Sequence, residues 1–170
     1  MKTFIKWSGN KTQHLSKILK FVPHNFNTYI EPFVGSGAMF LKLQPLRWII
    51  NDVNKDLINI WRHVGSHKVE DHIIANFKQF SKTFKKMNQD NQVNLCRQIT
   101  ERITDLPFNN ERAAAYMLMT MCSYNGNLLI KDKLYFGGLN MHITKRNKYY
   151  FLDEKYYTNL REIGKFIHVR

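Results

Sequence analysis

The apolar positions in the first third of the chain change period twice. A helix is predicted over residues 15–22, where apolar side chains recur every three or four positions until Pro23 stops the pattern. Strands are predicted at 29–34 and 47–51, and a helix over 38–43 separates them. This order predicts a strand–helix–strand unit of an α/β fold.

The middle of the chain is mainly helical in its pattern. Apolar residues keep helical spacing over 53–64, over 69–87 and, after a polar loop, over 95–103. Residues 113–122 are apolar on nearly every side, which predicts a buried helix.

The last third begins with a turn signal at 123–126, followed by a predicted hairpin with strands at 128–130 and 134–136. A helix near 153–163 and a short strand at 166–169 are expected to follow. We therefore divide the chain into three parts. They are 1–66 for the first α/β part, 67–150 for a mainly helical insertion with a hairpin, and 151–170 for a return to the α/β domain.

The composition indicates that the chain can form a hydrophobic core, and it indicates a class of partner. The 170 residues are 44% hydrophobic and 14% aromatic, which is enough for one folded domain, so disorder is not expected. The formal net charge of +13 favours a polyanionic partner, and nucleic acid is the first candidate. The alternative is a merely basic chain, or one from an organism with a lysine-rich coding bias.

The cysteines and the N-terminus favour a location inside the cell. Cys96 and Cys122 fall within apolar helical patterns and lack metal-like spacing, so we interpret them as core residues in a reducing compartment and expect no metal. Lys6 interrupts the N-terminal apolar run, so neither a signal peptide nor a membrane span is expected. We expect an intracellular protein, in the cytoplasm or nucleoid of its host, and the lysine- and asparagine-rich composition is compatible with phage or viral origin.

A glycine-rich loop and an acid carry the first candidate chemistry. Gly35 and Gly37 follow a predicted strand and open a helix, so the backbone there can approach a ligand closely. Asp52 ends the next strand, close to the interval of about 20 residues at which an acid accepts ribose hydroxyls in nucleotide sites. Two alternatives remain: the glycines make only a tight turn, and Asp52 is the N-cap of the following helix.

Three segments in this order resemble the Dam-type family of adenine-specific (N6) DNA methyltransferases. They are Phe4–Lys11, Tyr29–Lys42 and Arg47–Val64, and the similarity continues more weakly through Ala113–Gly126. The resemblance implies an α/β fold with a truncated Rossmann-like methyltransferase sheet and a helical DNA-recognition insertion. It also implies S-adenosylmethionine as cofactor, and it assigns to that cofactor Trp7, Lys11, Gly35, Gly37 and Asp52.

The same resemblance implies double-stranded DNA as partner. Tyr124 would wedge into the duplex while the target base is flipped out, and Asn125 and Asn127 would reach base edges. Phosphate contacts are expected from Lys131, Lys133, Lys145, Arg146 and Lys148. The family's hairpin usually carries an arginine for guanine and a Phe-Asn-x-Pro-Phe-Gly segment, and this chain departs from both, so its DNA sequence specificity stays open.

The family's catalytic motif is the main departure. Its members use an Asp-Pro-Pro-Tyr type tetrapeptide to accept hydrogen bonds from the adenine N6, and these 170 residues contain no Pro-Pro pair. The sequence ends about where that motif would be expected next. Asp105, in Asp105-Leu106-Pro107-Phe108, is a weak catalytic candidate, and we interpret its segment as a turn between two helices.

Three functions remain open on these observations. In the first, the chain supplies the cofactor and DNA sites, is inactive alone, and a second polypeptide supplies the tetrapeptide and further strands. In the second, it is a catalytically dead methyltransferase relative, retained to bind DNA or protein through a partner or homodimer surface. In the third, it is an active short methyltransferase that uses Asp105.

Overall fold

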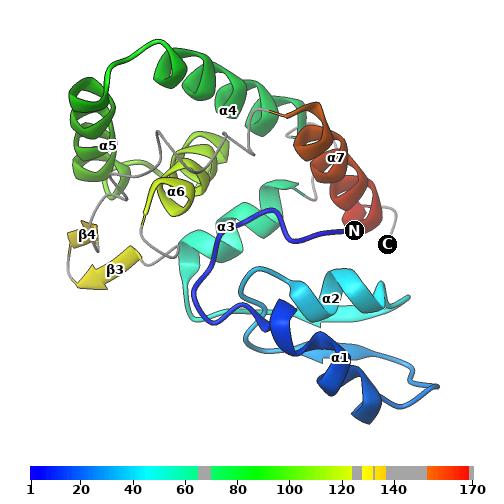
Figure 1. Cartoon of the computed structure of the whole chain (residues 1–170). Helices are drawn as coiled ribbons and strands as arrows, with labels where there is room; N and C mark the ends of the chain where they lie inside the picture. Colours follow the sequence, from blue (N-terminus) through cyan, green and yellow to red (C-terminus); the bar gives the residue numbers. More distant parts are fainter. Residues whose placement is uncertain (65–69, 124–127, 132, 137–152, 169–170) are drawn as a thin grey trace.

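The predicted strand–helix–strand unit is present near the start of the chain in this computed structural model (Figure 1). The strands β1 (Tyr29–Glu31) and β2 (Trp48–Ile50) run parallel, and α2 (Ala38–Leu43) connects them. The structure describes residues 1–64, 70–123, 128–131, 133–136 and 153–168.

Both strands are shorter than predicted. They pair over three residues each, and Ile30 lies opposite Ile49 at the centre of the register. Pro32 has no N–H to donate, so the ladder cannot continue regularly beyond β1. The chain instead turns, and the Val34 N–H donates to the Asn51 carbonyl at 2.9 Å. The strands therefore end at the loops that carry the candidate site.

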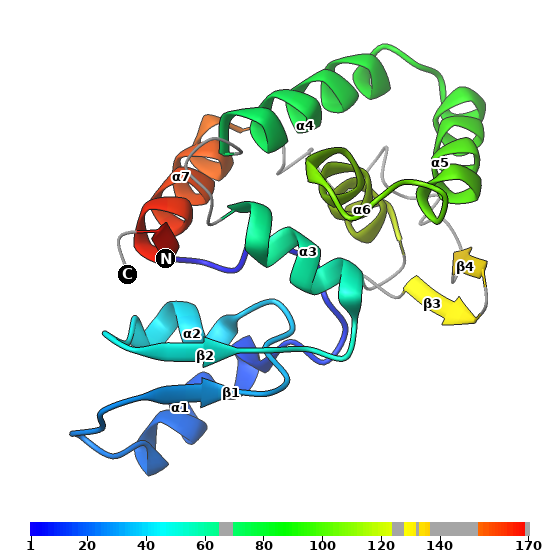
Figure 2. The ribbon, with the colours of Figure 1, turned by 180° about the vertical axis from the view of Figure 1, so that it is seen from behind.

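The two faces of this small sheet differ in burial. Phe40 of α2 is fully buried; its ring stacks on Tyr29 with centroids 6.4 Å apart and meets Trp48 edge-on at 5.0 Å. On the opposite face, Ile30 is 61% exposed and Ile49 is 58% exposed. Figure 2 shows β1 and β2 in front of α2, with no described element over the near side of the strands. One face of the sheet is covered and the other is open.

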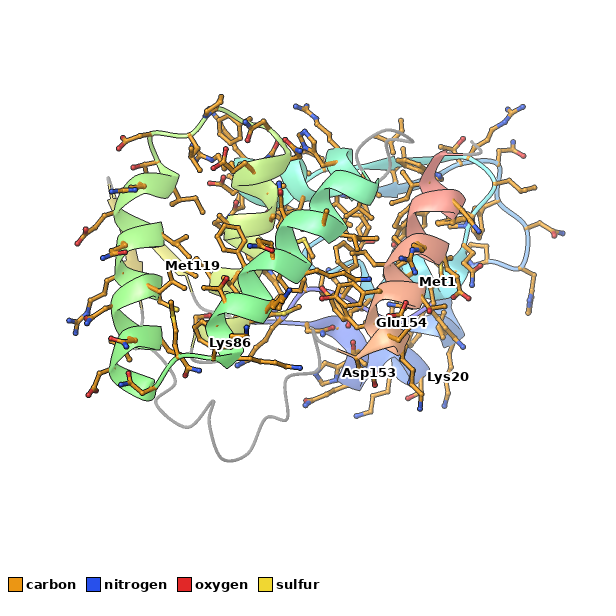
Figure 3. The ribbon with its side chains drawn as sticks, turned by 90° about the horizontal axis from the view of Figure 1, so that it is seen from above. Met1, Lys20, Lys86, Met119, Asp153 and Glu154 are labelled. Carbon is orange, nitrogen blue, oxygen red and sulfur yellow. The ribbon has the colours of Figure 1, made fainter. Side chains whose placement is uncertain are left out.

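A helical region packs beside this unit. Its helices are α3 (Lys55–Val64), α4 (Glu70–Lys85), α5 (Gln89–Ile103) and α6 (Asn110–Cys122). Helix α6 packs against the other three, and residues 112–120 along it are all buried, as its apolar pattern predicted. Met119 of α6 is fully buried and is labelled among the packed helices in Figure 3.

A buried ion pair joins α3 to α6. Arg112 Nη2 lies 3.0 Å from Asp56 Oδ2, and the Arg112 Nε also donates to that carboxylate. Both side chains are less than a tenth exposed. Arg112 Nη1 donates to the Leu106 carbonyl at 2.7 Å, so one guanidinium holds α3, α6 and the turn before α6.

The N-terminal segment begins beside the last helix, α7 (Glu154–His168) (Figure 1). Lys2 N donates to Asn159 Oδ1 at 3.0 Å, and the Tyr156 hydroxyl donates to the Phe4 carbonyl at 2.8 Å. The strand predicted at 166–169 is wrong, because α7 continues through His168. Its apolar residues keep helical spacing to the end, so the pattern there was helical and not alternating.

The remaining elements are short. The first predicted helix is a run of helical turns, η1 (Lys11–His14), α1 (Leu15–Ile18) and η2 (Leu19–Phe21). The predicted hairpin is confirmed as the antiparallel pair β3 (Leu128–Lys131) and β4 (Lys133–Phe136). The chain thus has a mixed helix and strand fold with a small parallel sheet. Within the described ranges, no helix is both long and apolar enough to cross a bilayer.

Candidate functional site

A small pocket opens where β1 and β2 end. It has a volume of about 170 Å³ and is lined by residues 7–11 of the N-terminal segment, by 33–36 with Ala38, and by Asp52. Four of the five residues predicted for the cofactor, namely Trp7, Lys11, Gly35 and Asp52, line it together. The segments that the sequence placed in one site are therefore neighbours in space.

Lys11 supplies a positive charge at one side of the pocket. Its Nζ donates to the Phe33 carbonyl at 2.9 Å and to Glu31 Oε1 at 3.3 Å. An ammonium has three N–H donors, so one remains for a ligand carboxylate. Sequence reasoning missed Glu31, which is buried and also accepts the Tyr29 hydroxyl at 2.8 Å. Burial, together with this carboxylate, raises the pKa of Tyr29.

Asp52 supplies a carboxylate from the end of β2. Its Oδ2 accepts the Gly35 N–H at 3.0 Å and its Oδ1 accepts the Asn54 N–H at 3.0 Å. Each oxygen keeps capacity for a further donor, such as a ribose hydroxyl. Asp52 is not the cap of α3, because the Leu57 N–H donates to Asn54 Oδ1 instead. The alternative of a simple N-cap at Asp52 is therefore wrong.

The two glycines have different neighbours. Both have positive φ, 53° at Gly35 and 71° at Gly37. A Cβ on Gly35 would lie 3.2 Å from Trp7 Cδ1 at the pocket wall, whereas one on Gly37 would lie 2.5 Å from the Trp61 ring. Gly37 does not line the pocket; it lets Trp61 pack beneath the loop, where Trp61 Nε1 donates to the Gly35 carbonyl at 3.1 Å.

Lys6 lies beside the pocket residue Trp7, and sequence reasoning did not single it out as a site residue. Its Nζ donates to the carbonyl of Ser123 at 2.9 Å, immediately after α6. Burial lowers the pKa of Lys6. The contact joins residues 117 positions apart, so no local pattern in the sequence indicated it.

The residues predicted to contact DNA fall mostly outside the described part of the chain. Tyr124, Asn125, Asn127, Lys145, Arg146 and Lys148 all lie there. The described hairpin pairs Lys131 with Lys133 across its end, which brings these two positions together.

The weak catalytic candidate is placed apart from the pocket. Asp105 is exposed in the turn between α5 and α6 and does not line the pocket. Its N–H donates to the Arg102 carbonyl at 3.0 Å. The segment is thus the helix-to-helix turn that the sequence predicted.

The donors and acceptors around the pocket fit a nucleoside that carries an amino acid. A carboxylate at one side suits a ribose diol, and an ammonium with a spare N–H suits a free carboxylate. Because Gly35 has no Cβ, it does not crowd the Trp7 side chain that forms the pocket wall. Among the described residues, no group of three His, Cys, Asp or Glu side chains is arranged to hold a metal ion.

Comparison with known proteins gives a match over nearly the whole chain. Residues 7–167 match the family model of the D12 class N6 adenine-specific DNA methyltransferases. The Type II methyltransferase M1.LlaDCHI of Lactococcus lactis subsp. cremoris is 29% identical over 139 residues, which cover 78% of this chain and 45% of that protein.

Two other relatives cover more of the chain. The Type II methyltransferase M.MjaIII of Methanocaldococcus jannaschii is 28% identical over 98% of this chain and 59% of its own length. A DNA adenine methylase of Serratia marcescens is 30% identical over 92% of this chain and 54% of its own length. The chain thus spans about half the length of these relatives.

Proposed function

Because the chain belongs to the D12 class of N6 adenine-specific DNA methyltransferases, we propose that it provides the S-adenosylmethionine site and the DNA-recognition part of such an enzyme. The observation that carries this proposal is the pocket itself. Lys11 and Asp52, from segments far apart in the sequence, line one pocket within the region that matches the family.

The pocket residues would bind and orient the cofactor. Asp52 accepts the ribose hydroxyls, and its orientation is held by the N–H groups of Gly35 and Asn54. The spare N–H of Lys11 binds the methionine carboxylate, and Trp7 forms the wall beside the Gly35 loop. The bound cofactor supplies the methyl group for adenine N6.

The DNA-binding role rests on charge and on the hairpin. The net charge of +13 favours a duplex partner through counterion release. The predicted wedge Tyr124 lies in the segment between α6 and β3, and the cluster Lys145, Arg146 and Lys148 follows the hairpin in the chain. We propose that these residues open the duplex and bind its phosphates, inside the cell where DNA is available.

Methyl transfer requires a group that accepts hydrogen bonds from the adenine N6. In the family this group is the Asp-Pro-Pro-Tyr type motif, which is not found in these 170 residues. We propose that polypeptide beyond these residues supplies an Asp-Pro-Pro-Tyr type motif and covers the open sheet face at Ile30 and Ile49. The exposure of this apolar pair supports that part, since a sheet face left in water is usually buried by another layer.

A methyl-transfer assay tests the proposal. The chain is incubated with radiolabelled S-adenosylmethionine and duplex DNA, alone and with a polypeptide that carries the Asp-Pro-Pro-Tyr half of a relative. We expect transfer only in the mixture, and its loss with Asp52→Ala. Transfer by the chain alone that Asp105→Ala abolishes would instead establish the short active enzyme. If separate binding measurements show that the chain binds DNA but not the cofactor, it is a catalytically dead binding module.

A further inference from the structure

Tyr116 places a hydroxyl in the middle of the most apolar helix. It is fully buried on α6, between Ala115 and Met117, where phenylalanine would fill the same space. Its hydroxyl accepts a hydrogen bond from Asn54 Nδ2 at 2.9 Å. A buried tyrosine hydroxyl is stable only with such a partner, so the position of Asn54 and the identity of Tyr116 are linked.

Asn54 is held by four hydrogen bonds, one of them from the Ile58 N–H to its backbone carbonyl at 3.1 Å. Its side-chain oxygen caps α3 by accepting the Leu57 N–H at 3.0 Å, and its side-chain amide reaches Tyr116. Its backbone N–H donates to Asp52 Oδ1 at 3.0 Å. With both ends of its side chain bonded, Asn54 is fixed in place, and its backbone N–H points at Asp52.

Asp52 lines the pocket, whereas Tyr116 and Asn54 do not. We propose that Tyr116 is a positioning residue for Asp52, acting through Asn54, so that α6 controls the affinity of the pocket for S-adenosylmethionine. The inference rests on the proposed role of Asp52 as ribose acceptor. Helix α6 precedes the β3–β4 hairpin in the chain, so the helix before the candidate DNA-binding elements would also support the cofactor site.

The first test is cofactor affinity in Tyr116→Phe, measured by calorimetry well below the melting temperature. The variant keeps the ring and removes only the hydroxyl. We expect S-adenosylmethionine to bind roughly 3- to 10-fold more weakly, as for loss of one hydrogen bond. Tyr157→Phe is the matched control, since Tyr157 is also buried, on α7, and does not line the pocket. If the Tyr116 hydroxyl is only structural, Tyr116→Phe will lower the melting temperature but leave the cofactor affinity unchanged, as we expect for Tyr157→Phe.

A double-mutant cycle tests the route through Asn54. Asn54→Ser keeps a side-chain oxygen to cap α3 and removes the amide that reaches Tyr116. We expect it to weaken cofactor binding, and Tyr116→Phe to add less than 2-fold in its background. Fully additive effects would overturn the route.

Amide hydrogen exchange gives a readout without cofactor. The N–H groups of Gly35 and Asn54 both donate to Asp52. We expect both to exchange several-fold faster in Tyr116→Phe than in the wild type and in Tyr157→Phe; unchanged exchange overturns the inference. If the wild-type chain binds no cofactor, the proposed function fails while exchange still decides whether Tyr116 positions Asp52. If the wild type binds and Tyr116→Phe binds equally well, only this inference fails.

Discussion

At the scale of single residues, Gly37 shows how backbone and packing requirements combine. Its φ is 71°, and a Cβ there would lie 2.5 Å from the Trp61 ring. Gly37→Ala is expected to reduce the free energy of unfolding by about 3 kcal/mol, through the positive φ and the forced shift of Trp61. Urea denaturation of the purified variant measures this change.

Gly9 is the matched control for that substitution. Its φ is 73°, yet nothing lies within 4 Å of the added Cβ. Gly9→Ala should therefore cost only the backbone strain, about 1 kcal/mol. Equal losses in the two variants would show that the Trp61 contact contributes nothing.

The hydroxyl of Tyr116 is expected to make stability depend on alkaline pH. Burial raises the pKa of Tyr116 in the folded chain above its ordinary value of 10.0, and the hydrogen bond from Asn54 acts in the opposite direction. The unfolded chain releases this proton above pH 10, whereas the folded chain retains it, so the stabilisation is complete below pH 10 and falls as pH rises.

The comparison of wild type with Tyr116→Phe isolates this effect. Between pH 10 and 11, the wild type should lose about 1 kcal/mol more stability than the variant. Urea denaturation of both proteins at pH 9, 10 and 11 measures the difference. A difference in stability that stays constant with pH would contradict the prediction.

The sequence predicted the charged members of the site but not their partners. Lys11, Asp52 and the glycine loop belong to local patterns with a known spacing. Glu31, Asn54 and Lys6 have roles set by contacts over 20, 62 and 117 residues respectively. Such contacts depend on tertiary packing, which leaves no periodic signal in one sequence.

At the scale of elements, one buried ion pair contributes to the pairing of α3 with α6. Arg112 and Asp56 are both buried, so removing one partner leaves the other charge without compensation. Arg112→Met is expected to cost about 3 to 5 kcal/mol of stability. Thermal and urea denaturation check this value.

The exposed pair Arg161–Glu154 on α7 is the comparison. Its side chains are 41% and 70% exposed, with an N–O distance of 3.3 Å. Arg161→Met should change stability by less than about 1 kcal/mol, because water screens such pairs. Similar losses for Arg112→Met and Arg161→Met would contradict a stabilising contribution of the buried pair to α3–α6 packing.

The elements themselves were predicted best where their pattern was long. The buried helix α6 and the order β1, α2, β2 follow from periodicity and turn residues. The starts of α3 and α5 were misplaced because side chains cap them: Asn54 accepts from Leu57 and Asn88 accepts from Asn91. The false strand at 166–169 came from treating a short apolar run by itself, although its spacing with the preceding residues of α7 is helical.

At the scale of the whole molecule, the charge of +13 predicts salt-dependent DNA binding. Replacing Lys145, Arg146 and Lys148 by alanine should reduce the slope of log affinity against log salt by about 2.7, at roughly 0.9 per phosphate contact. Fluorescence anisotropy with a DNA duplex, at salt concentrations on the order of 50 to 300 mM, measures this slope.

A second triple variant that loses the same charge elsewhere separates the effect of these phosphate contacts from the effect of net charge. Lys17, Lys20 and Lys82 are exposed on α1, η2 and α4. Their joint replacement by alanine should leave most of the slope intact. Equal slope changes in the two triple variants would mean that charge acts without a defined DNA surface.

The central claim is the cofactor site at the ends of β1 and β2. Calorimetric titration of the chain with S-adenosylmethionine tests it most directly, with Asp52→Ala as the disabling variant. Asp105→Ala is the control, since that acid is exposed and outside the pocket. We predict binding by the wild type and by Asp105→Ala, and loss of binding in Asp52→Ala. Absence of wild-type binding, or equal binding by all three proteins, would contradict the assignment of the pocket to the cofactor.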